Sequence, residues 1–352
     1  MNKKIEVLDC TLRDGGLALE DAMLVTGSKS SFKENTVLDF IKTMKSSLID
    51  IVELGAIEIT NKNQNEFSIY KSIEQVSKLI LDNKPDNQMY VALFRGPDTP
   101  IEDIPEWNPS YCEGIRVIIR YSEINKSLNF CRSLAEKGYK VFVQPMLTMR
   151  YNNRELDTLI NEANELGAYA LYLVDSYGYM DSNDVLKLFR FFDKGLNDKI
   201  RIGFHSHNNM NLAFSNVCEF VGQKSNRSII VDSTIMGMGQ GAGNIQTELL
   251  IPYLNDLNSN NYNFYSVLDA CEIIDPFWKH NLWGYSVLNL LPALSKTAYK
   301  YSSSLRKKHK LSYAQIHKIL SNIPEELRHR YTIDNTNKLL EIFNVSSKKK
   351  KL

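Results

Sequence analysis

The stretch LDCTLRDGG, Leu8 to Gly16, decides how the rest of the sequence is interpreted. Apolar residues lead into it, and Arg13 and Asp14 stand side by side before a pair of glycines. Charged groups at the end of a strand are costly to desolvate, so they need partners. The pattern predicts a buried strand that delivers Arg13 and Asp14 to the rim of a barrel. A strand-end salt bridge followed by a turn is the alternative for this segment on its own.

The composition is that of an ordinary soluble protein. The chain has 352 residues, of which 43% are hydrophobic and 24% charged, and its net charge of +1 gives no support to a nucleic-acid partner. It opens without the apolar core of a signal peptide, and no stretch reaches the roughly 18 apolar residues of a membrane span. Five widely spaced cysteines without a CxxC pair indicate reduced thiols. We therefore expect a cytoplasmic protein with no membrane partner.

Short β-rich apolar runs alternate with amphipathic stretches, which predicts parallel strands joined by helices. Strands are expected near 5–8 and at 48–54, 89–94, 114–120, 140–146, 168–174, 201–204 and 228–231. Helices are expected at 36–46, 67–81, 123–137, 154–166, 183–192 and 212–221, and a loop at 17–35. Eight such units over about 250 residues favour a closed α/β structure, the (β/α)8 TIM barrel.

Beyond the eighth strand the alternation stops, and helical patterns follow at 264–274, 283–300, 313–320 and 337–343. We therefore expect a barrel over residues 1–255, an all-α region that closes over it at 256–345, and a disordered basic tail at 346–352. The aromatic helices after residue 260 are expected to form either a dimer contact or a substrate lid.

Polar residues gather directly after the apolar runs, where the loops of such barrels build the active face. The set comprises Asp9, Arg13, Asp14, Glu53, Arg95, Arg120, Gln144, Asp175, Ser176, His205, His207 and Asp232. A barrel that served only as a scaffold would not need so many ionisable groups at one end.

Two histidines follow the seventh strand in the sequence GFHSHNN. On an extended segment, His205 and His207 lie on one side because side chains alternate with period two. Two imidazoles and one carboxylate form a facial set of metal ligands with open positions for substrate. The other four histidines come after residue 278, so this pair is the one on the face that carries Asp14. The pattern favours a metal site, and two hydrogen-bonded histidines at a strand end are the alternative.

The run GMGQGAGN, Gly237 to Asn244, follows the eighth strand. Its glycines permit positive φ and close approach of the backbone to a ligand. The run matches neither a Walker loop nor a Rossmann fingerprint in its usual place. It is either a phosphate cradle or a flexible active-site loop that ends in a possible metal ligand, Asn244.

Taken together, TLRDG, HSHNN and GMGQGAGN resemble, in order and spacing, the motifs of the metal-dependent aldolase and lyase TIM barrels. This family includes the hydroxymethylglutaryl-CoA lyases, the isopropylmalate and homocitrate synthases and the hydroxy-oxovalerate aldolases. The resemblance covers roughly residues 5 to 250. The sequences HNN, GAGN, Val174-Asp175-Ser176 and Gly284-Tyr285-Ser286 are most similar to the pyruvate aldolase branch.

The resemblance implies a role for each matching residue. Asp14, His205 and His207 would bind a divalent metal, Mn²⁺ or Mg²⁺, with Asn244 as a possible fourth ligand. Arg13 would stabilise an enolate oxygen, Ser176 would contact the substrate carboxylate, and Tyr285 would line the site. From the strand-end set, we expect Gln144 to bind the substrate as well. A divalent ion polarises the carbonyl of a 2-oxo acid as a Lewis acid, and a guanidinium stabilises the oxygen on which charge develops.

The chain departs from the family at two places. The hydroxy-oxovalerate aldolases have a basic histidine a few residues after the Arg-Asp pair, and here the segment reads GGLAL. Hydroxymethylglutaryl-CoA lyase has a cysteine in the glycine loop, which is missing here. The acid or base is therefore open, with Glu53, Tyr285, Glu20 and Asp21 as candidates.

We expect an aldolase that makes or cleaves a carbon–carbon bond between pyruvate, as a metal-bound enolate, and an aldehyde. A sugar derivative is one candidate for the aldehyde, because CTLRDGG also resembles barrel proteins of sugar-modification pathways. The alternatives are a Claisen-type synthase that joins an acyl-CoA to a 2-oxo acid, and a non-catalytic metal-binding partner subunit. A homodimer is the expected assembly.

Overall fold

Eight parallel strands form a closed barrel in the computed structural model, which describes residues 4–60, 66–80, 88–258, 262–278 and 283–345. The barrel closes because the first strand pairs with both the second and the last, with Leu8 opposite Ile51 and Val7 opposite Val231. The predicted TIM barrel is confirmed. Its strands are β1 (Ile5–Asp9), β2 (Ile51–Ile57), β4 (Met89–Phe94), β5 (Gly114–Ile119), β6 (Lys140–Pro145), β7 (Ala170–Asp175), β8 (Arg201–Ser206) and β9 (Ile229–Ser233).

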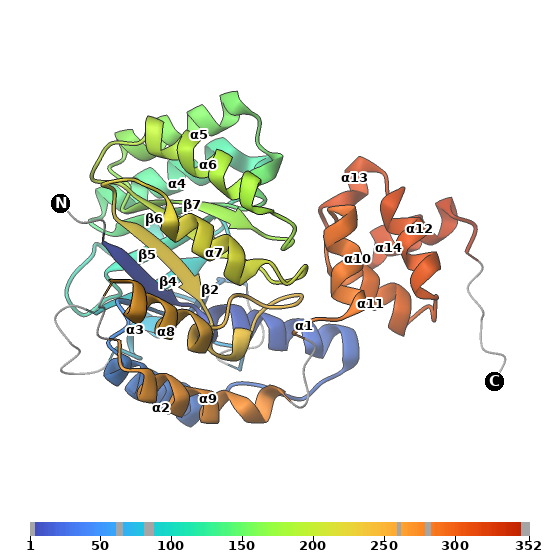
Figure 1. Ribbon diagram of the computed structural model, residues 1–352, viewed down its shortest axis with the longest axis horizontal. Helices are drawn as coiled ribbons and strands as arrows, with labels where there is room; N and C mark the ends of the chain where they lie inside the picture. Colours follow the sequence, from blue (N-terminus) through green and yellow to red (C-terminus); the bar gives the residue numbers. More distant parts are fainter. Residues whose placement is uncertain (1–3, 61–65, 81–87, 259–261, 279–282, 346–352) are drawn as a thin grey trace.

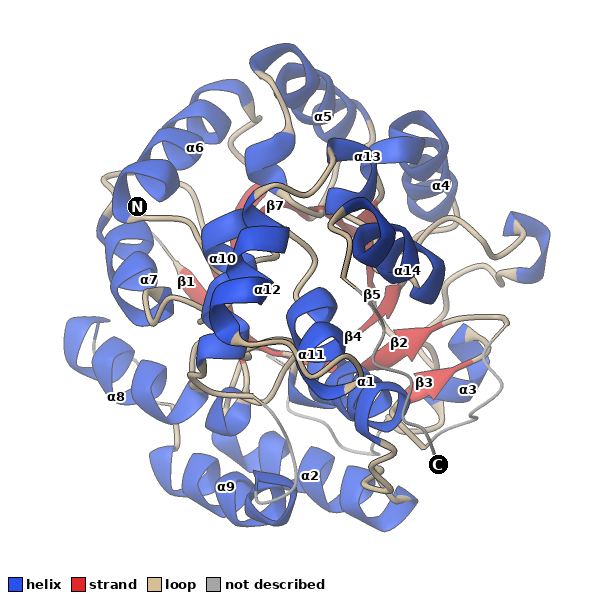
Figure 2. Cartoon of the chain, turned by 90° about the vertical axis from the view of Figure 1, so that its right-hand side faces the viewer, coloured by secondary structure: helices blue, strands red, loops and turns tan. Residues whose placement is uncertain are grey.

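A layer of helices surrounds the strands (Figures 1 and 2). Parallel strands covered on both faces are apolar along their whole length, which explains their unbroken hydrophobic runs in the sequence. The covering helices are α2 (Glu34–Ser47), α3 (Ile73–Ser77), α4 (Ile124–Glu136), α5 (Asn153–Glu165), α6 (Ser182–Gly195), α7 (Ala213–Gly222) and α8 (Thr247–Asn258). Short helical turns lie at Ile101–Asp103, Tyr121–Glu123, Thr148–Arg150 and Ile235–Gly237.

Helix α6 illustrates how the sequence specifies this layer. Asp181 and Asp184 form a capping box, in which each side chain accepts a hydrogen bond from the other residue's backbone N–H. Val185, Leu188 and Phe192 recur at helical spacing and are buried. One face of the helix therefore packs on the barrel.

The segment after β1 differs from its prediction as a loop. A π-helical turn (η1, Thr11–Gly15) runs directly into helix α1 (Gly16–Thr26), which ends at Gly27 in the left-handed conformation. Leu17, Leu19 and Ala22 of α1 are buried, and a Cβ on Gly16 would come within 1.8 Å of the carbonyl oxygen of Phe67. The glycine pair thus lets α1 begin in close contact with the chain around Phe67.

The predicted helix at 67–81 is wrong over its first half. The structure has a two-residue strand there, β3 (Ile69–Tyr70), which pairs with Ala56 and Ile57 of β2, and only the short helix α3 after it. The apolar residues of this segment suit a helix or a strand, and the free edge of β2 favours the strand because Ile69 and Tyr70 can pair with it. Residue 81 lies outside the described residues.

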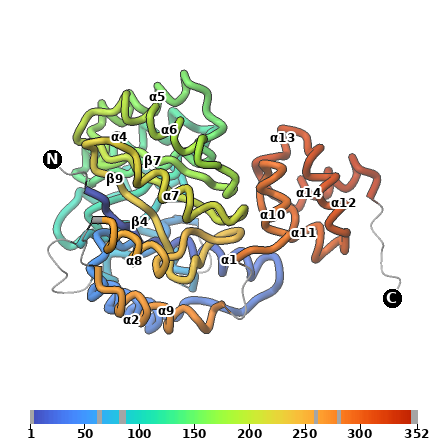
Figure 3. Tube along the Cα trace, viewed as in Figure 1, coloured from blue at the N-terminus to red at the C-terminus, as the bar shows by residue number. Residues whose placement is uncertain are grey.

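The chain after the barrel is helical, as predicted. Its helices are α9 (Phe264–Trp278), α10 (Val287–Ser295), α11 (Lys300–Lys307), α12 (Tyr313–Ser321), α13 (Glu325–Arg328) and α14 (Ile333–Ile342). Helix α9 lies beside α2, and its buried side chains join the hydrophobic core of the barrel (Figure 3). Helices α10 to α14 pack around a second core that includes Tyr301, Ile316 and Leu339.

On these two cores we propose that the boundary between the barrel and the C-terminal helices lies between α9 and α10. The division at residue 255 remains a prediction from sequence, and the tail at 346–352 lies outside the described residues. Figure 2 shows α10 to α14 in front of the barrel strands, so this helical layer covers one end of the barrel. Within the described residues, no helix has the length and apolar character needed to cross a bilayer.

Candidate active site

A cavity of about 410 Å³ lies between the carboxyl ends of the strands and the C-terminal helical layer. The barrel contributes Arg13, Asp14, Gln144, Ser176, His205 and His207 to its wall. The C-terminal helices and their loops contribute Ala298, Tyr299, Lys300, His329, Arg330 and Tyr331. The structure therefore brings six residues of the predicted site to one cavity, at the end of the barrel where TIM-barrel enzymes place their active sites.

Three of these side chains form a compact group. Donor atoms of Asp14, His205 and His207 all lie within 4.8 Å of one another, and all three residues are buried. The two Nε2 atoms are 3.2 Å apart, and each lies 3.9 Å from Oδ2 of Asp14. A carboxylate and two imidazoles in this arrangement match a facial ligand set for a divalent ion.

The hydrogen bonds on the far side of each ring decide its tautomer. Nδ1 of His205 faces Oδ2 of Asp232 at 2.9 Å, and Nδ1 of His207 faces the backbone oxygen of Gln240 at 3.1 Å. Since both partners accept, each Nδ1 carries the hydrogen and each Nε2 is left with its lone pair. Two lone pairs and a carboxylate oxygen that converge in this way repel one another unless a cation lies among them. The residues present therefore fit a divalent metal.

The protonation states agree with this arrangement. Burial lowers the pKa of both imidazoles, most strongly that of His205, so both rings are neutral at pH 7. Burial alone would raise the pKa of Asp14, but the Arg13 guanidinium and the two imidazoles outweigh it and lower that pKa. Neutral histidines and an ionised carboxylate are the forms that bind metals.

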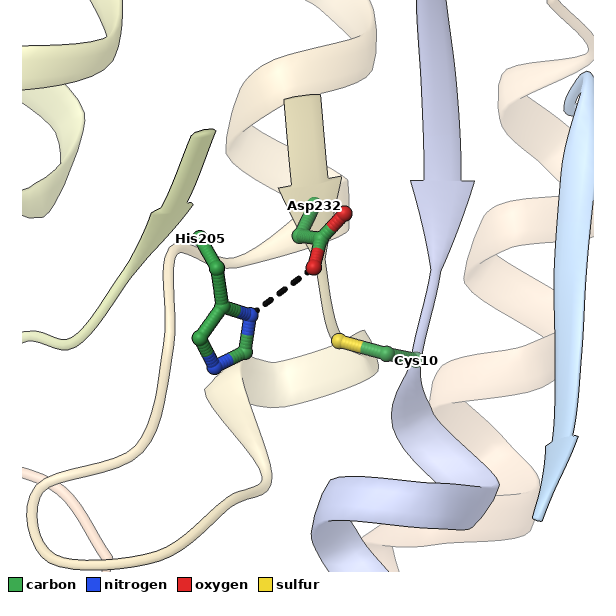
Figure 4. A group of neighbouring side chains, drawn as sticks. All are labelled: Cys10, His205 and Asp232. Atoms are coloured by element: carbon green, nitrogen blue, oxygen red, sulfur yellow. Dashed lines mark hydrogen bonds and ion pairs between the residues drawn. The ribbon is translucent and has the colours of Figure 1, made fainter. Parts of the chain in front are cut away.

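A second group, Cys10, His205 and Asp232, also has the spacing of metal ligands (Figure 4). Asp232 already forms an ion pair with Arg116, and the Cys10 thiol donates to the backbone oxygen of Ser233 at 3.4 Å. Burial raises the pKa of Cys10 well above its ordinary value, which disfavours the thiolate that metals require. We interpret this group as the support that orients His205.

Asn244 reaches the metal group from the glycine loop. Its Nδ2 donates to Oδ2 of Asp14 at 2.5 Å, and its buried Oδ1 has no hydrogen-bond partner among the described residues. The loop is a tight turn, because Gly243 has a φ of +80° and a Cβ there would lie 1.8 Å from the backbone oxygen of Gly237. The glycines therefore serve to hold Asn244 against Asp14, and its part as a fourth ligand stays a prediction.

Arg13 is held from two sides at the floor of the cavity. Its Nη1 donates to Oδ1 of Asp14 at 2.7 Å, and its Nε donates to Oε2 of Glu53 at 2.9 Å. The structure does not bring Glu53 to the cavity. Its carboxylate is fully buried between Arg13 and Arg116, whose Nη1 donates to it at 2.7 Å, so it positions Arg13 and does not face substrate.

Arg116 links the two halves of the site. It is fully buried on β5, pairs with Glu53 through Nη1 and with Asp232 through Nη2, and lies 5.0 Å from the ring centre of Tyr172. With its amide oxygen turned toward Arg116, Gln144 accepts from Nη2 and Nε at 3.2 and 3.3 Å. A chain of ion pairs and hydrogen bonds thus runs from Arg13 to His205.

Ser176 lies in the cavity wall, and its contact with substrate stays a prediction. Its Oγ accepts a hydrogen bond from the backbone N–H of Leu147 at 2.9 Å, which leaves its own hydrogen free to be donated. Gln144 lies in the same wall and is 4% exposed.

The structure does not bring Tyr285 to the cavity. This residue lies before α10 and is 60% exposed, whereas Tyr299, just before α11, lines the cavity wall. The Tyr299 hydroxyl donates to Asp21 and accepts from Nε2 of Gln240 at 2.7 Å. A tyrosine from the C-terminal region does reach the site, but it is a different one.

Asp21 and Glu20, two further candidates for the acid or base, lie on α1. Oδ1 of Asp21 pairs with Nζ of Lys300 at 2.5 Å, next to the hydrogen bond from Tyr299. Glu20 pairs with Arg95 at 3.3 Å instead. Both acids thus pair with cations that line the cavity, and Asp21 in addition accepts the hydrogen bond from Tyr299.

Sequence reasoning missed Arg116 and Tyr299. Arg116 left a signal, because it is the single charged residue of the strand sequence GIRVII. A lone charge in a strand buried on both faces requires a buried partner. Tyr299 left no local signal, since only the packing of α11 against α1 brings it to the barrel.

Comparisons with known proteins find aldolase-like and lyase-like proteins similar to this chain. Residues 112–274 match the HMGL-like family model. A 4-hydroxy-2-oxovalerate aldolase from Geobacillus genomosp. 3 is 23% identical to this chain over 275 residues, which cover 77% of each chain. Another, from Pelotomaculum thermopropionicum, is 34% identical over 165 residues, which cover 47% of each chain. The N-terminal domain of a Bacteroides vulgatus protein assigned as an aldolase superposes with a TM-score of 0.70 at 22% identity, over 90% of this chain and 97% of that one. The predicted resemblance is confirmed.

Exchanging single residues separates the two possible metal groups, which share His205. We expect His207→Ala to weaken Mn²⁺ binding by at least about 100-fold, because it removes a ligand from the group around Asp14. Cys10→Ser, the matched control, should retain Mn²⁺. Calorimetric titration with Mn²⁺ measures both. If Cys10→Ser lost Mn²⁺ binding while His207→Ala retained it, the assignment of the metal to the group around Asp14 would be contradicted.

The same titration has an expected pH dependence. Protons compete with the ion for the two Nε2 atoms, so Mn²⁺ affinity falls as the pH falls. Because burial lowers the pKa of both imidazoles, the fall begins below the ordinary titration range of histidine. An affinity that already declines above that range would show that the rings are not held neutral.

Arg116→Met tests the buried ion network. The change leaves Glu53 and Asp232 without their shared cation, and losing one partner of a buried pair costs about 3–5 kcal/mol. Urea unfolding should show a loss of this size. Arg190→Met, at an exposed position on α6, is the control and should change the free energy of unfolding little. A loss in Arg116→Met no larger than the control's would mean that the network does not stabilise the barrel.

Proposed function

We propose that this chain, a carbon–carbon lyase whose residues 112–274 match the HMGL-like family model, is a divalent-metal-dependent aldolase acting on pyruvate and an aldehyde. The relatives named 4-hydroxy-2-oxovalerate aldolase support a 2-oxo acid as one participant. The observation that carries the proposal is the convergence of Asp14, two neutral imidazoles and Arg13 in one cavity. Mn²⁺ or Mg²⁺ is the ion we expect there.

Asp14, His205 and His207 would hold the ion. When bound, it supplies Lewis-acid polarisation of the carbonyl of the 2-oxo acid. Arg13 adds a fixed positive donor beside that carbonyl. Its Nε and Nη1 are paired with Glu53 and Asp14, and among the described residues Nη2 has no acceptor, so this donor is available to the oxygen on which charge develops.

The carboxylate of pyruvate has donors in the same wall. The Ser176 hydroxyl is free to donate because its oxygen already accepts from Leu147. The side-chain oxygen of Gln144 accepts from Arg116, which leaves the two hydrogens on Nε2 directed away from Arg116. Both groups orient the acid by hydrogen bonding without adding charge.

Tyr299 and Asp21 supply the proton transfer in place of the missing histidine. Burial, reinforced by the Asp21 carboxylate, raises the pKa of Tyr299 well above its ordinary value, so the phenol is protonated at rest. In cleavage, Tyr299 accepts the hydroxyl proton of the substrate while it passes its own proton to Asp21. In condensation both protons move in the opposite direction, and the aldehyde oxygen becomes the hydroxyl.

The size of the cavity favours an aldehyde longer than two carbons. At about 410 Å³ it falls in the range of roughly 300–1,000 Å³ typical of sites for drug-sized ligands. Together with the resemblance of CTLRDGG to barrel proteins of sugar modification, this supports a sugar-derived aldehyde. No observation on the described residues favours the Claisen-type synthase or the non-catalytic subunit. A cytoplasmic homodimer remains our expectation for the assembly.

Exchange of the pyruvate methyl hydrogens with deuterated water tests the proposal. We expect exchange that depends on added Mn²⁺, and Arg13→Lys should slow it by about 10²–10³-fold while Mn²⁺ is retained, because an ammonium cannot reproduce the fork of donors. NMR of the methyl signal measures the rate. An absence of exchange in the Mn²⁺-loaded wild-type protein would overturn the proposal.

Tyr299→Phe tests the proton transfer separately. We expect condensation and cleavage to slow by about 10²–10⁴-fold, the usual contribution of a positioned acid or base, with pyruvate exchange preserved. Tyr285→Phe is the matched comparison, because this exposed tyrosine does not line the cavity. Assays of both variants with the same aldehyde show which of the two tyrosines takes part in the proton transfer. Full activity in Tyr299→Phe, with loss in Tyr285→Phe, would restore the original expectation.

A further inference from the structure

The wall of the cavity changes character between its floor and its outer end. The floor carries Asp14, the single acidic residue among those that line the cavity. The outer end carries Arg95 from the barrel and Lys300, His329 and Arg330 from the C-terminal region. A substrate that reaches from the metal group toward the C-terminal helices therefore meets basic side chains at its far end.

Two of these cations are neutralised within the protein. Arg95 pairs with Glu58 at 2.6 Å and with Glu20 at 3.3 Å. Lys300 pairs with Asp21 at 2.5 Å. Arg95 and Lys300 are therefore poor candidates for binding a substrate anion, because the charge of each is already compensated by a carboxylate.

The guanidinium of Arg330 differs from both. It is exposed, and in the described part of the chain no carboxylate pairs with it. Its main chain is fixed instead: the backbone oxygen accepts from the Tyr301 hydroxyl at 2.8 Å and from Nδ2 of Asn335 at 2.7 Å. The backbone is thus held in place while the charge stays available.

His329 fixes the same segment over the barrel. Its Nδ1 lies 3.1 Å from the hydroxyl of Tyr177, the two rings are stacked at 6.0 Å with an angle of 8°, and its Nε2 lies 3.0 Å from Glu325. Burial lowers the pKa of His329, so the ring contributes hydrogen bonds and not charge at pH 7. Arg330 therefore follows a residue that is tied to the barrel end of the cavity.

We propose that the aldehyde substrate carries an anionic group, a phosphate or a carboxylate, remote from its carbonyl, and that Arg330 binds this group. The inference rests on the proposed aldolase function and specifies the class of its second substrate. Each of these anions offers a pair of oxygens that a guanidinium can bind through two parallel hydrogen bonds. The uncompensated charge at the outer end also draws anions toward the cavity.

Two matched pairs of aldehydes test the inference in condensation with pyruvate by the Mn²⁺-loaded full chain. The first pair is glyceraldehyde and glyceraldehyde 3-phosphate, and the second is butanal and succinic semialdehyde. We expect kcat/KM to be roughly 10- to 100-fold higher for the anionic member of at least one pair, since a hydrogen-bonded charge contributes this much. The pair with the larger ratio tells whether the group is a phosphate or a carboxylate.

Variants assign the preference to Arg330. In Arg330→Gln the KM for the anionic aldehyde should rise by roughly 10- to 100-fold, with the neutral aldehyde unaffected. Arg330→Lys should recover part of the loss, because it restores the charge without the fork. Arg190→Gln, at the exposed position on α6, is the control for a general change in surface charge and should leave both values unchanged.

The outcomes separate this inference from the function on which it rests. Pyruvate exchange with equal kcat/KM for anionic and neutral aldehydes would overturn the anionic substrate and leave the aldolase. An anionic preference that persists in Arg330→Gln would overturn the assignment to Arg330. An absence of exchange would overturn the aldolase and the inference together.

Discussion

A buried chain of alternating charges, from Arg13 through Glu53, Arg116 and Asp232 to His205, underlies the whole site. Removing charges from water is expensive, and each member is tolerated in the barrel because its neighbours carry the opposite charge or accept its hydrogen. The chain crosses the barrel from the turn after β1, through β2, β5 and β9, to β8. It fixes the guanidinium on one side and the imidazole tautomer on the other, so the geometry of the metal group is set before any ligand arrives.

The site residues that could be predicted from the sequence are those marked by a local pattern, such as their spacing or their position at the end of a strand. Period-two spacing places His205 and His207 on one side of a strand, and the end of β1 places Arg13 and Asp14 at the rim. The closed barrel then brings these ends together, because parallel strands present their carboxyl ends at the same edge. Alternating patterns were sufficient to predict the barrel.

The remaining features depend on contacts between distant parts of the chain. Glu53 has the residue type of an acid or base, yet two arginines bury it beneath the floor. Tyr285 matches a motif and is exposed, while Tyr299 reaches the cavity through the packing of α11 against α1. Helix α1 was not recognised in the sequence because Gly27 and several serines follow it. In each case the tertiary neighbour, and not the local pattern, determines the role.

Anomalous X-ray diffraction from crystals soaked with Mn²⁺ and oxalate tests the central claim most directly. Oxalate resembles the enolate of pyruvate in its planar pair of oxygens. The account predicts one strong anomalous peak within bonding distance of Asp14, His205 and His207, with oxalate on the open side next to Arg13. A peak next to Cys10 and Asp232 would contradict it. So would the absence of a peak next to Asp14, His205 and His207 in crystals where Mn²⁺ fully occupies another site.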